Sequence, residues 1–276
     1  MHEEDPGPVV QRLVLGERLR ALREASAIGL DEANAALKWY RGKLSKVENG
    51  MLAVTEAELS ALLDRYGVTG PEAARVKQLG VEARRRAAPE RVSDWARQYI
   101  PLERTASEIR MIYSEIPGLL QTKDYAKIQL ARSPVVMGVD IEAMAAAREE
   151  RGNRLYRDNA PRVWVVLGEE ALLRRIGTTE IMHAQLLRLK DIAQLPIVSL
   201  RIFRLDQGPY AGLSCPFTLL WIEKARATIA YVETLTGADY IKTTAAYSAS
   251  FEQVYNEALP EDETLALIDH YLERHS

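Results

Sequence analysis

Four basic side chains stand close together near residue 40, and their spacing is typical of a nucleic-acid-binding surface. Lys38, Arg41, Lys43 and Lys46 lie within nine residues that contain no acidic side chain. Such cations can neutralise phosphates, and an arginine or lysine can also hydrogen-bond to the edge of a guanine. From charge alone, a solvated helix face is an equally good interpretation.

A helix over residues 41–48 would give this segment one buried and one exposed face. Leu44 and Val47 are three residues apart, so both would face inward. Lys43 would then lie beside an outward face made of Arg41, Gly42, Ser45 and Lys46. Asn49-Gly50 supplies a stop signal after this helix.

The flanking sequence predicts further helices that would hold this segment in place. Leu15, Leu19 and Leu22 form one stripe of a helix over 10–25, and residues 31–37 form a short second helix. Thr55-Glu56-Ala57-Glu58 reads as a capping box that opens a fourth helix, closed by Gly67. A helix, a short helix, a turn and a third helix form a helix-turn-helix, whose third helix enters the major groove of DNA.

Several strings along residues 12–273 carry a resemblance to known proteins. In the head they are residues 15–23 and Leu44-Ser45-Lys46-Val47-Glu48-Asn49-Gly50. The later strings are Leu102-Glu103, residues 116–126, Gly168-Glu169, residues 184–186, Pro216-Phe217 and residues 231–234. Together they resemble one actinobacterial family of regulators, in which an Xre-type helix-turn-helix head precedes a domain long described as of unknown function. The resemblance implies a DNA-binding, antitoxin-like transcriptional regulator that is commonly encoded beside a small acidic partner protein.

Position by position, the resemblance makes Arg41, Gly42 and Lys46 base-facing and Lys43 a phosphate contact. It gives Glu48 and Asn49 structural roles. We expect Glu48 to be buried or half-buried and to pair with a basic side chain of the first helix, Arg18 being our choice.

The head departs from the family pattern at several positions. Leu30 replaces a polar phosphate contact, and Asn34 replaces a small residue between the second and third helices. Lys38 stands where the turn usually has glycine, so it must adopt a positive φ if the turn is unchanged. Met51-Leu52-Ala53 also replaces the usual basic residues after Asn-Gly. One head should therefore bind DNA modestly, which favours a homodimer on paired half-sites.

Two other segments are open to a functional or a structural interpretation. Pro117, Gly118, Gln121 and Tyr125 are candidates for binding a partner or ligand. The structural interpretation of their string is a type II turn at Pro117-Gly118 and a helix capped by Thr122, with Asp124 near its positive end. Arg84-Arg85-Arg86 would extend the phosphate footprint or form a solvated helix face.

Little in the chain indicates catalysis or a metal site. Glu169 and Glu170 follow a predicted strand and His183 lies downstream, but no nucleophile motif or phosphate-binding loop accompanies them. Cys215 is expected to be a buried apolar residue. The four histidines are scattered, so we expect no enzyme, no metal and no cofactor.

Composition and charge favour a cytoplasmic protein of two domains, and the expected DNA binding would make it nucleoid-associated. The 276 residues are 47% hydrophobic, and their longest apolar runs have the length of strands, which predicts no membrane association. The acidic first residues do not resemble a secretory signal. Net charge is −3, yet residues 75–91 hold six basic and two acidic side chains. The positive charge therefore lies in the first third of the chain.

The predicted fold is mixed: an all-α helix-turn-helix domain over 10–70, a helical connector over 71–98, and a larger α+β domain over 99–276. Beyond residue 92 we expect a mostly helical segment up to Ile116. Strands are expected at 163–167, 198–204, 217–222 and 228–232, in a small and mostly antiparallel sheet. Helices are expected at 140–157, 179–194, 244–258 and 261–273.

Three hypotheses of function follow from these features. In the first, the head binds double-stranded operator DNA and the larger domain mediates dimerisation, partner binding or signal reception. In the second, an interaction module with a degenerate head sequesters a small partner protein; Leu30, Asn34 and Met51 favour it, and the cationic face opposes it. A small-molecule sensor is compatible with either.

Overall fold

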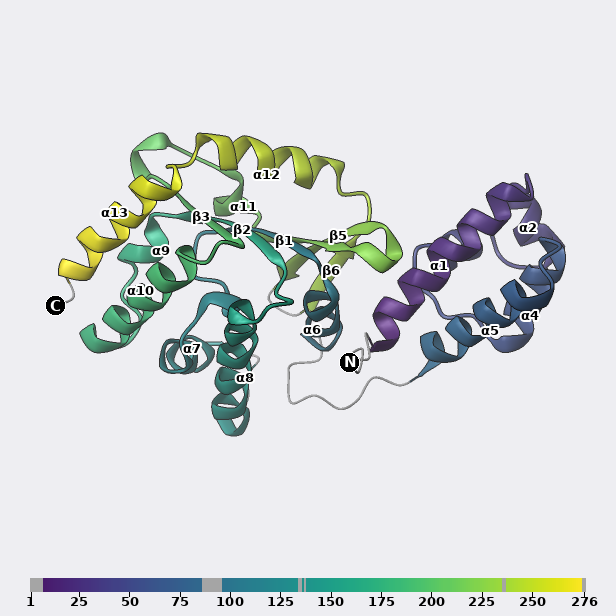
Figure 1. The fold of residues 1–276 in the computed structure, drawn as a ribbon, viewed down its shortest axis with the longest axis horizontal. Coiled ribbons are helices and arrows are strands. Elements are labelled where there is room, and N and C mark those ends of the chain that lie inside the picture. Colours follow the sequence, from purple (N-terminus) through teal and green to yellow (C-terminus); the bar gives the residue numbers. More distant parts are fainter. Residues whose placement is uncertain (1–6, 86–95, 134–135, 137, 235–236, 275–276) are drawn as a thin grey trace. The chain divides into compact units, whose positions relative to one another are not determined.

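The computed structural model describes residues 7–85, 96–133, 136, 138–234 and 237–274. These residues form two compact units (Figure 1). The first unit contains five N-terminal helices, and the second is built around a β-sheet.

The first unit also includes residues 97–105 and 222–227, and its five N-terminal helices pack around one apolar core. They are α1 (Gly7–Ala25), α2 (Leu30–Ala36), α3 (Lys43–Glu48), α4 (Glu56–Arg65) and α5 (Gly70–Arg84). Leu19, Leu44, Leu59 and Leu62 lie in this core with no exposed surface. The predicted stripe of α1 is therefore confirmed, and the core contains side chains from every predicted helix of the head.

The segment that we expected to begin the connector forms α5. Its Val76 and Ala83 are buried in the same core as the side chains of α1 and α4. Pro71 stands in the first turn of α5, where a missing N–H costs no hydrogen bond. Residues 86–95 of the predicted connector lie outside the described residues.

The second unit contains a six-stranded sheet in the order β3-β2-β1-β4-β5-β6. The strands are β1 (Glu108–Tyr113), β2 (Arg162–Gly168), β3 (Val198–Phe203), β4 (Phe217–Ile222), β5 (Ala227–Thr234) and β6 (Gly237–Ile241). β1 pairs in parallel with β2, and β2 pairs in parallel with β3, whereas β1 and β4 are antiparallel. The expectation of a small, mostly antiparallel sheet is thus matched only in part: β5 and β6 are also antiparallel, but the six-stranded sheet is mixed, because helical crossovers follow β1 and β2.

Two strands of this sheet contradict the expected secondary structure. β1 lies in the segment predicted to be mostly helical, and β6 was not predicted. In β1, buried Ile109 and Met111 alternate with the charged side chains of Glu108 and Arg110, which is a period of two. Because charged side chains occupy these alternate positions, the short apolar pattern did not lead us to predict a strand here.

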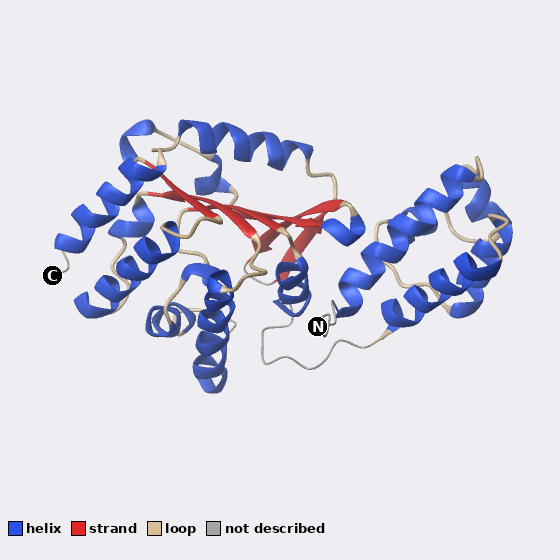
Figure 2. Ribbon diagram, viewed as in Figure 1, coloured by secondary structure: helices blue, strands red, loops and turns tan. Residues whose placement is uncertain are grey.

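Helices cover both faces of the sheet. They are α7 (Lys123–Leu130), α8 (Ile141–Asn153), α9 (Glu170–Leu173), α10 (Thr179–Ala193), α11 (Ala211–Ser214), α12 (Ala245–Glu257) and α13 (Glu261–Glu273), while α6 (Ala96–Thr105) precedes β1. Figure 2 shows α12 on one face and α7, α8 and α10 on the other. No helix within the described ranges combines the length and the apolar composition needed to cross a bilayer.

The outer edge of β3 is anchored by Leu259, which lies between α12 and α13, and by the start of α13. Leu259 donates its backbone N–H to the carbonyl of Ile202 over 2.9 Å, and the N–H of Ile202 is bonded to Oγ1 of Thr264 over 3.1 Å. Glu261 accepts a hydrogen bond from Ser199 and pairs with Arg201 of the same strand. This edge of the sheet is therefore bonded to its own chain.

The predicted turn at Pro117-Gly118 has a different geometry. Gly118 begins the 3₁₀ helix η1 (Gly118–Leu120), and its φ is not positive, so a type II turn is wrong. A Cβ at Gly118 would meet Arg148 at 3.3 Å, so glycine leaves room for that side chain. Thr122 caps α7 as predicted, by accepting a hydrogen bond from the N–H of Tyr125.

We predict that Gly16→Ala destabilises the first unit. A Cβ at Gly16 would lie 2.5 Å from the carbonyl oxygen of Glu48, so α1 and α3 must separate. We expect a loss of about 1–3 kcal/mol in the free energy of unfolding. Urea denaturation measures it, with Gly29→Ala as the control, since nothing lies within 4 Å of a Cβ there. Equal effects of the two substitutions would contradict the close approach of α1 and α3.

We also predict a pH-dependent contribution from Glu261. Burial alone would raise the pKa of Glu261, but hydrogen bonds from Ser199, from its own backbone N–H and from Arg201 lower the pKa to about 2. An unfolded glutamate has a pKa of about 4.3. The carboxylate therefore stabilises the folded state above about pH 4.3, and this contribution is lost as the pH falls toward the folded pKa.

Glu261→Gln should consequently reduce the free energy of unfolding more at pH 7 than at acidic pH, as measured by urea denaturation. Glu263→Gln is the matched control, because Glu263 is exposed in the same first turn of α13. If Glu261→Gln reduces the free energy of unfolding equally at every pH, the ionised carboxylate is excluded as the cause.

Candidate nucleic-acid interface

The turn between α2 and α3 is held by the side chain of Asn34. Asn34 is 4% exposed, donates to the carbonyl of Leu30 over 2.9 Å and accepts from the backbone N–H of Leu44 over 3.0 Å. Its amide thus joins the start of α2 to the first turn of α3. From the sequence, we noted only that Asn34 replaces the small residue usual at this position. Its role in bridging α2 and α3 was not predicted.

Two residues in this turn adopt left-handed backbone conformations. Lys38 has a φ of 55°, as we predicted from its place in the turn. Gly42 has a φ of 87° and precedes the first residue of α3. The helix therefore begins at Lys43, two residues later than predicted, and Arg41 lies in the turn before it.

Three of the predicted DNA-contacting cations point into solvent. Lys38, Arg41 and Lys46 are exposed, and none of them forms an ion pair with another described residue. The ammonium of Lys46 lies 5.7 Å from the ring centroid of Tyr40, which is itself 56% exposed. These side chains are available to phosphates and bases, and Tyr40 joins them as an exposed aromatic residue that was not predicted.

Lys43 lies in a different environment. Its ammonium pairs with Glu58 of α4 and stands 4.3 Å above the ring of Trp39. Burial alone would raise the pKa of Glu58, but hydrogen bonds from Lys43 and Thr55 outweigh it and lower the pKa. Glu58 also completes the predicted capping box with Thr55. A phosphate must therefore compete with a carboxylate for Lys43.

A buried ion pair ties α3 to α1. Glu48 is 2% exposed; its Oε1 lies 2.6 Å from Nε of Arg23, and its Oε2 lies 3.0 Å from Nη2 of the same arginine. The hydrogen bonds that Arg23 donates to Glu48 raise the pKa of Arg23 despite its burial. The burial of Glu48 and its pairing with the first helix are as predicted, but Arg18 is the wrong partner.

Helix geometry explains why Glu48 pairs with Arg23 and not with Arg18. Arg23 follows Leu19 by four residues and so lies on the stripe that faces the core, whereas Arg18 lies on another face and pairs with Glu72 of α5. Arg20 also reaches α3, because its Nη2 donates to Oδ1 of Asn49 over 2.8 Å. Asn49 thus has the expected structural contact.

The candidate ligand residues of the second unit are mostly buried. Pro117, Gln121 and Tyr125 are buried, and Gly118 is partly exposed. Gln121 donates to the carbonyl of Ile116 over 2.7 Å and accepts from Arg148 over 2.8 Å. Burial raises the pKa of Tyr125. These contacts support the structural interpretation of the string.

The residues considered for acid–base chemistry do not form one site. Glu169 accepts hydrogen bonds from the hydroxyl of Tyr271 and the N–H of Leu205, and Glu170 accepts from Tyr210. His183 lies on α10, and among the described residues no hydrogen bond joins it to either carboxylate. Both glutamates therefore position neighbouring elements.

Three remaining candidates have local roles. Cys215 is only half-buried, so the expected full burial is wrong. Arg84 donates to the carbonyl of Val54 over 3.4 Å, and Arg85 pairs with Glu82, while Arg86 lies outside the described residues. Within the described part of the chain, no group of three or more histidine, cysteine, aspartate or glutamate side chains is placed to hold a metal ion.

Comparison with known proteins identifies two regions. A helix-turn-helix domain matches residues 14–76, and a family described as a domain of unknown function, DUF5753, matches residues 96–270. The comparisons with curated proteins and with solved structures gave no match. The helix-turn-helix match contains α2, α3 and the turn that carries the exposed cations.

We predict that Glu48→Ala strongly destabilises the head, because it leaves the buried guanidinium of Arg23 with only the exposed Glu24, 3.4 Å away, as a carboxylate partner. The expected loss in the free energy of unfolding is about 3–5 kcal/mol. The control is Glu72→Ala, which removes the partly exposed pair with Arg18 and should cost at most about 1 kcal/mol. Urea denaturation compares the two, and similar losses would show that the buried pair has no special role.

Proposed function

Because the chain belongs to the DUF5753 family and carries a helix-turn-helix domain before that region, we propose that it is a sequence-specific DNA-binding transcriptional regulator. In this proposal the head is of the Xre type, and the protein is a cytoplasmic, nucleoid-associated regulator of the actinobacterial, antitoxin-like kind. The chain carries out recognition and no catalysis.

The main support for the proposal is the exposed cationic surface within the helix-turn-helix match. Arg41 and Lys46 project from the turn and from α3 without a carboxylate partner among the described residues. Arg41 can donate two parallel hydrogen bonds to the O6 and N7 atoms of guanine, and Lys46 can reach a neighbouring base. Lys38 adds a phosphate contact.

The structural contacts of α3 make its orientation suitable for reading bases. The buried Arg23–Glu48 pair and the Asn34–Leu44 hydrogen bond hold the two ends of this helix. A rigidly held recognition helix loses little conformational entropy on binding. We propose that two heads act on paired half-sites, since α3 has only six residues and presents few cations.

The second unit would then mediate dimerisation, binding of a small acidic partner protein, or reception of a signal. An interaction module with a degenerate head is the second candidate function. It is favoured by the Lys43–Glu58 pair and by the exposed Leu30 and Met51, which are 38% and 59% exposed. Apolar side chains on this surface suit a protein partner better than a phosphate backbone.

DNA binding should respond differently to two alanine substitutions in the head. Arg41→Ala should cost about 1–3 kcal/mol at the preferred sequence and relax the base preference. Lys38→Ala should weaken binding to all sequences alike and reduce the slope of log affinity against log salt by about one. The measurement is a gel-shift titration with the DNA upstream of the gene, at several salt concentrations.

The outer-face substitution Arg75→Ala on α5 is the control, because it removes one exposed positive charge outside α2 and α3. A DNA affinity that changes neither with the salt concentration nor with the two head substitutions would contradict the proposed regulator and favour the interaction module.

A further inference from the structure

Lys43 is held by a carboxylate, in contrast to the other cations of the helix-turn-helix. Its ammonium pairs with Glu58 of α4, and the two side chains are only 17% and 25% exposed. Lys38, Arg41 and Lys46 form no ion pair with another described residue. The charge of Lys43 is therefore neutralised before any DNA approaches, whereas the charges of the other cations are free to attract phosphates.

The carboxylate of Glu58 is itself fixed by the start of α4. Its Oε2 accepts a hydrogen bond from the backbone N–H of Thr55 over 2.9 Å, and the N–H of Glu58 donates to Oγ1 of Thr55 over 3.2 Å. These two bonds form the capping box of the helix, and Oε1 remains to accept a hydrogen bond from Lys43. The capping box thus positions Glu58 to compete with a phosphate for this ammonium.

Lys43 stands beside the exposed cationic surface and can reach it without backbone movement. It is the first residue of α3, and its N–H donates to the carbonyl of Tyr40 over 3.1 Å. Between them, Gly42 has a φ of 87° and a ψ of −3°, as in the third residue of a type II turn, so Arg41 lies at the tip of this turn. A lysine carries its ammonium on a flexible four-carbon stem, so rotation of this stem is enough to direct the charge toward DNA.

The other contact of Lys43 would not prevent this movement. The ammonium stands 4.3 Å from the ring centroid of Trp39. An indole ring attracts a cation through its quadrupole but carries no net charge. Without the carboxylate, the positive charge of Lys43 would therefore be uncompensated even while it lies over Trp39.

We propose that Glu58 limits the DNA affinity of the head by occupying Lys43, so that the head makes one phosphate contact fewer than its cations allow. This inference rests on the proposed DNA-binding function, and it places the limiting residue on α4, outside the helices that would touch DNA. Loss of the Glu58 charge should strengthen binding, which is the opposite of the effect expected for Arg41→Ala and Lys38→Ala.

The test is Glu58→Gln in the full chain, titrated by fluorescence anisotropy against a short labelled DNA duplex at several salt concentrations. A duplex of arbitrary sequence is sufficient, because phosphate contacts do not depend on sequence. Glutamine keeps the capping box, so the fold should be retained, which circular dichroism verifies. We expect about tenfold tighter binding at low salt. The slope of log affinity against log salt should be steeper by about 0.9, which corresponds to one added phosphate contact.

Glu56→Gln is the matched control. Glu56 is exposed in the same first turn of α4 and forms no hydrogen bond or ion pair with another described residue. Its substitution removes the same charge from the head without releasing a lysine. If Glu58→Gln tightens binding no more than Glu56→Gln does, the proposal is overturned.

Lys43→Met shows whether the gain comes from Lys43. In the Glu58→Gln background it should remove the added affinity and the added slope, whereas in the unaltered chain it should change the slope far less. A gain that persists without Lys43 would contradict the proposal. Binding of every variant that does not depend on salt would overturn the proposed DNA binding, and this inference with it. Salt-dependent binding without the gain would overturn only the role of Glu58.

Discussion

The ion pair between Arg23 and Glu48 is the contact on which the geometry of the head depends. Both charges are almost fully removed from water, and their other partners, Arg20 for Glu48 and Glu24 for Arg23, are more exposed and lie farther away, at 3.6 and 3.4 Å. Each charge therefore depends mainly on the other. Leu44 and Val47 pack α3 against the core, but apolar contacts are not directional and would allow the helix to slide. The paired oxygens and nitrogens fix its rotation, and with it the direction in which Lys46 points.

The features of the head that the sequence predicted depend on local spacing, and those that it missed depend on contacts between helices. The leucine stripe of α1, the capping box at Thr55 and the positive φ of Lys38 each depend on local spacing, and each was predicted. The partner of Glu48 depends on where two helices cross, which one sequence does not encode locally, so Arg18 was chosen in place of Arg23. The engagement of Lys43 by Glu58 was missed for the same reason, since 15 residues separate them.

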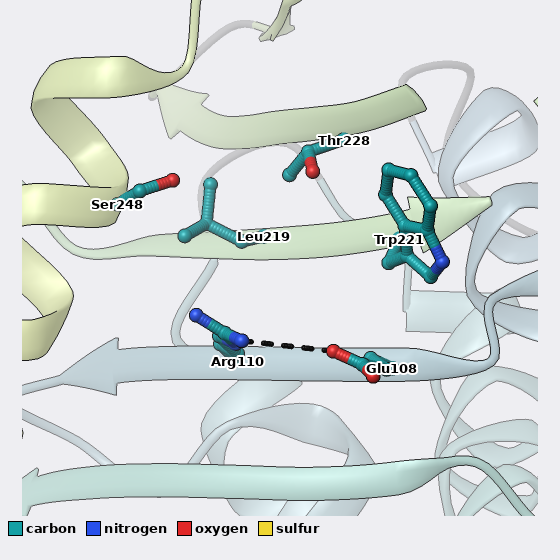
Figure 3. A pocket seen from close by; sticks show the side chains of 6 residues that line it. All are labelled: Glu108, Arg110, Leu219, Trp221, Thr228 and Ser248. Carbon is teal, nitrogen blue, oxygen red and sulfur yellow. Dashed lines mark ion pairs between the residues drawn. The ribbon is translucent and has the colours of Figure 1, made fainter. Parts of the chain in front are cut away.

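In the second unit, four strands and the long helices were predicted, whereas the pairing of the strands was not. β1 was hidden because its polar positions carry Glu108 and Arg110, whose charges are balanced by Arg162 and Glu252 from distant elements. This strand joins the parallel and antiparallel halves of the sheet, so missing it made the sheet look small and antiparallel. Glu108 and Arg110 also line a cavity of about 130 Å³ beside this strand (Figure 3).

The bonds that Leu259 and Thr264 make to Ile202 limit how copies of this protein can associate. An open strand edge is a template on which another chain can add a strand, and such additions lead to aggregation. Here both backbone groups of Ile202 on the edge strand β3 are bonded to the protein's own chain. A neighbouring chain therefore cannot pair with β3 at Ile202 without breaking these two bonds.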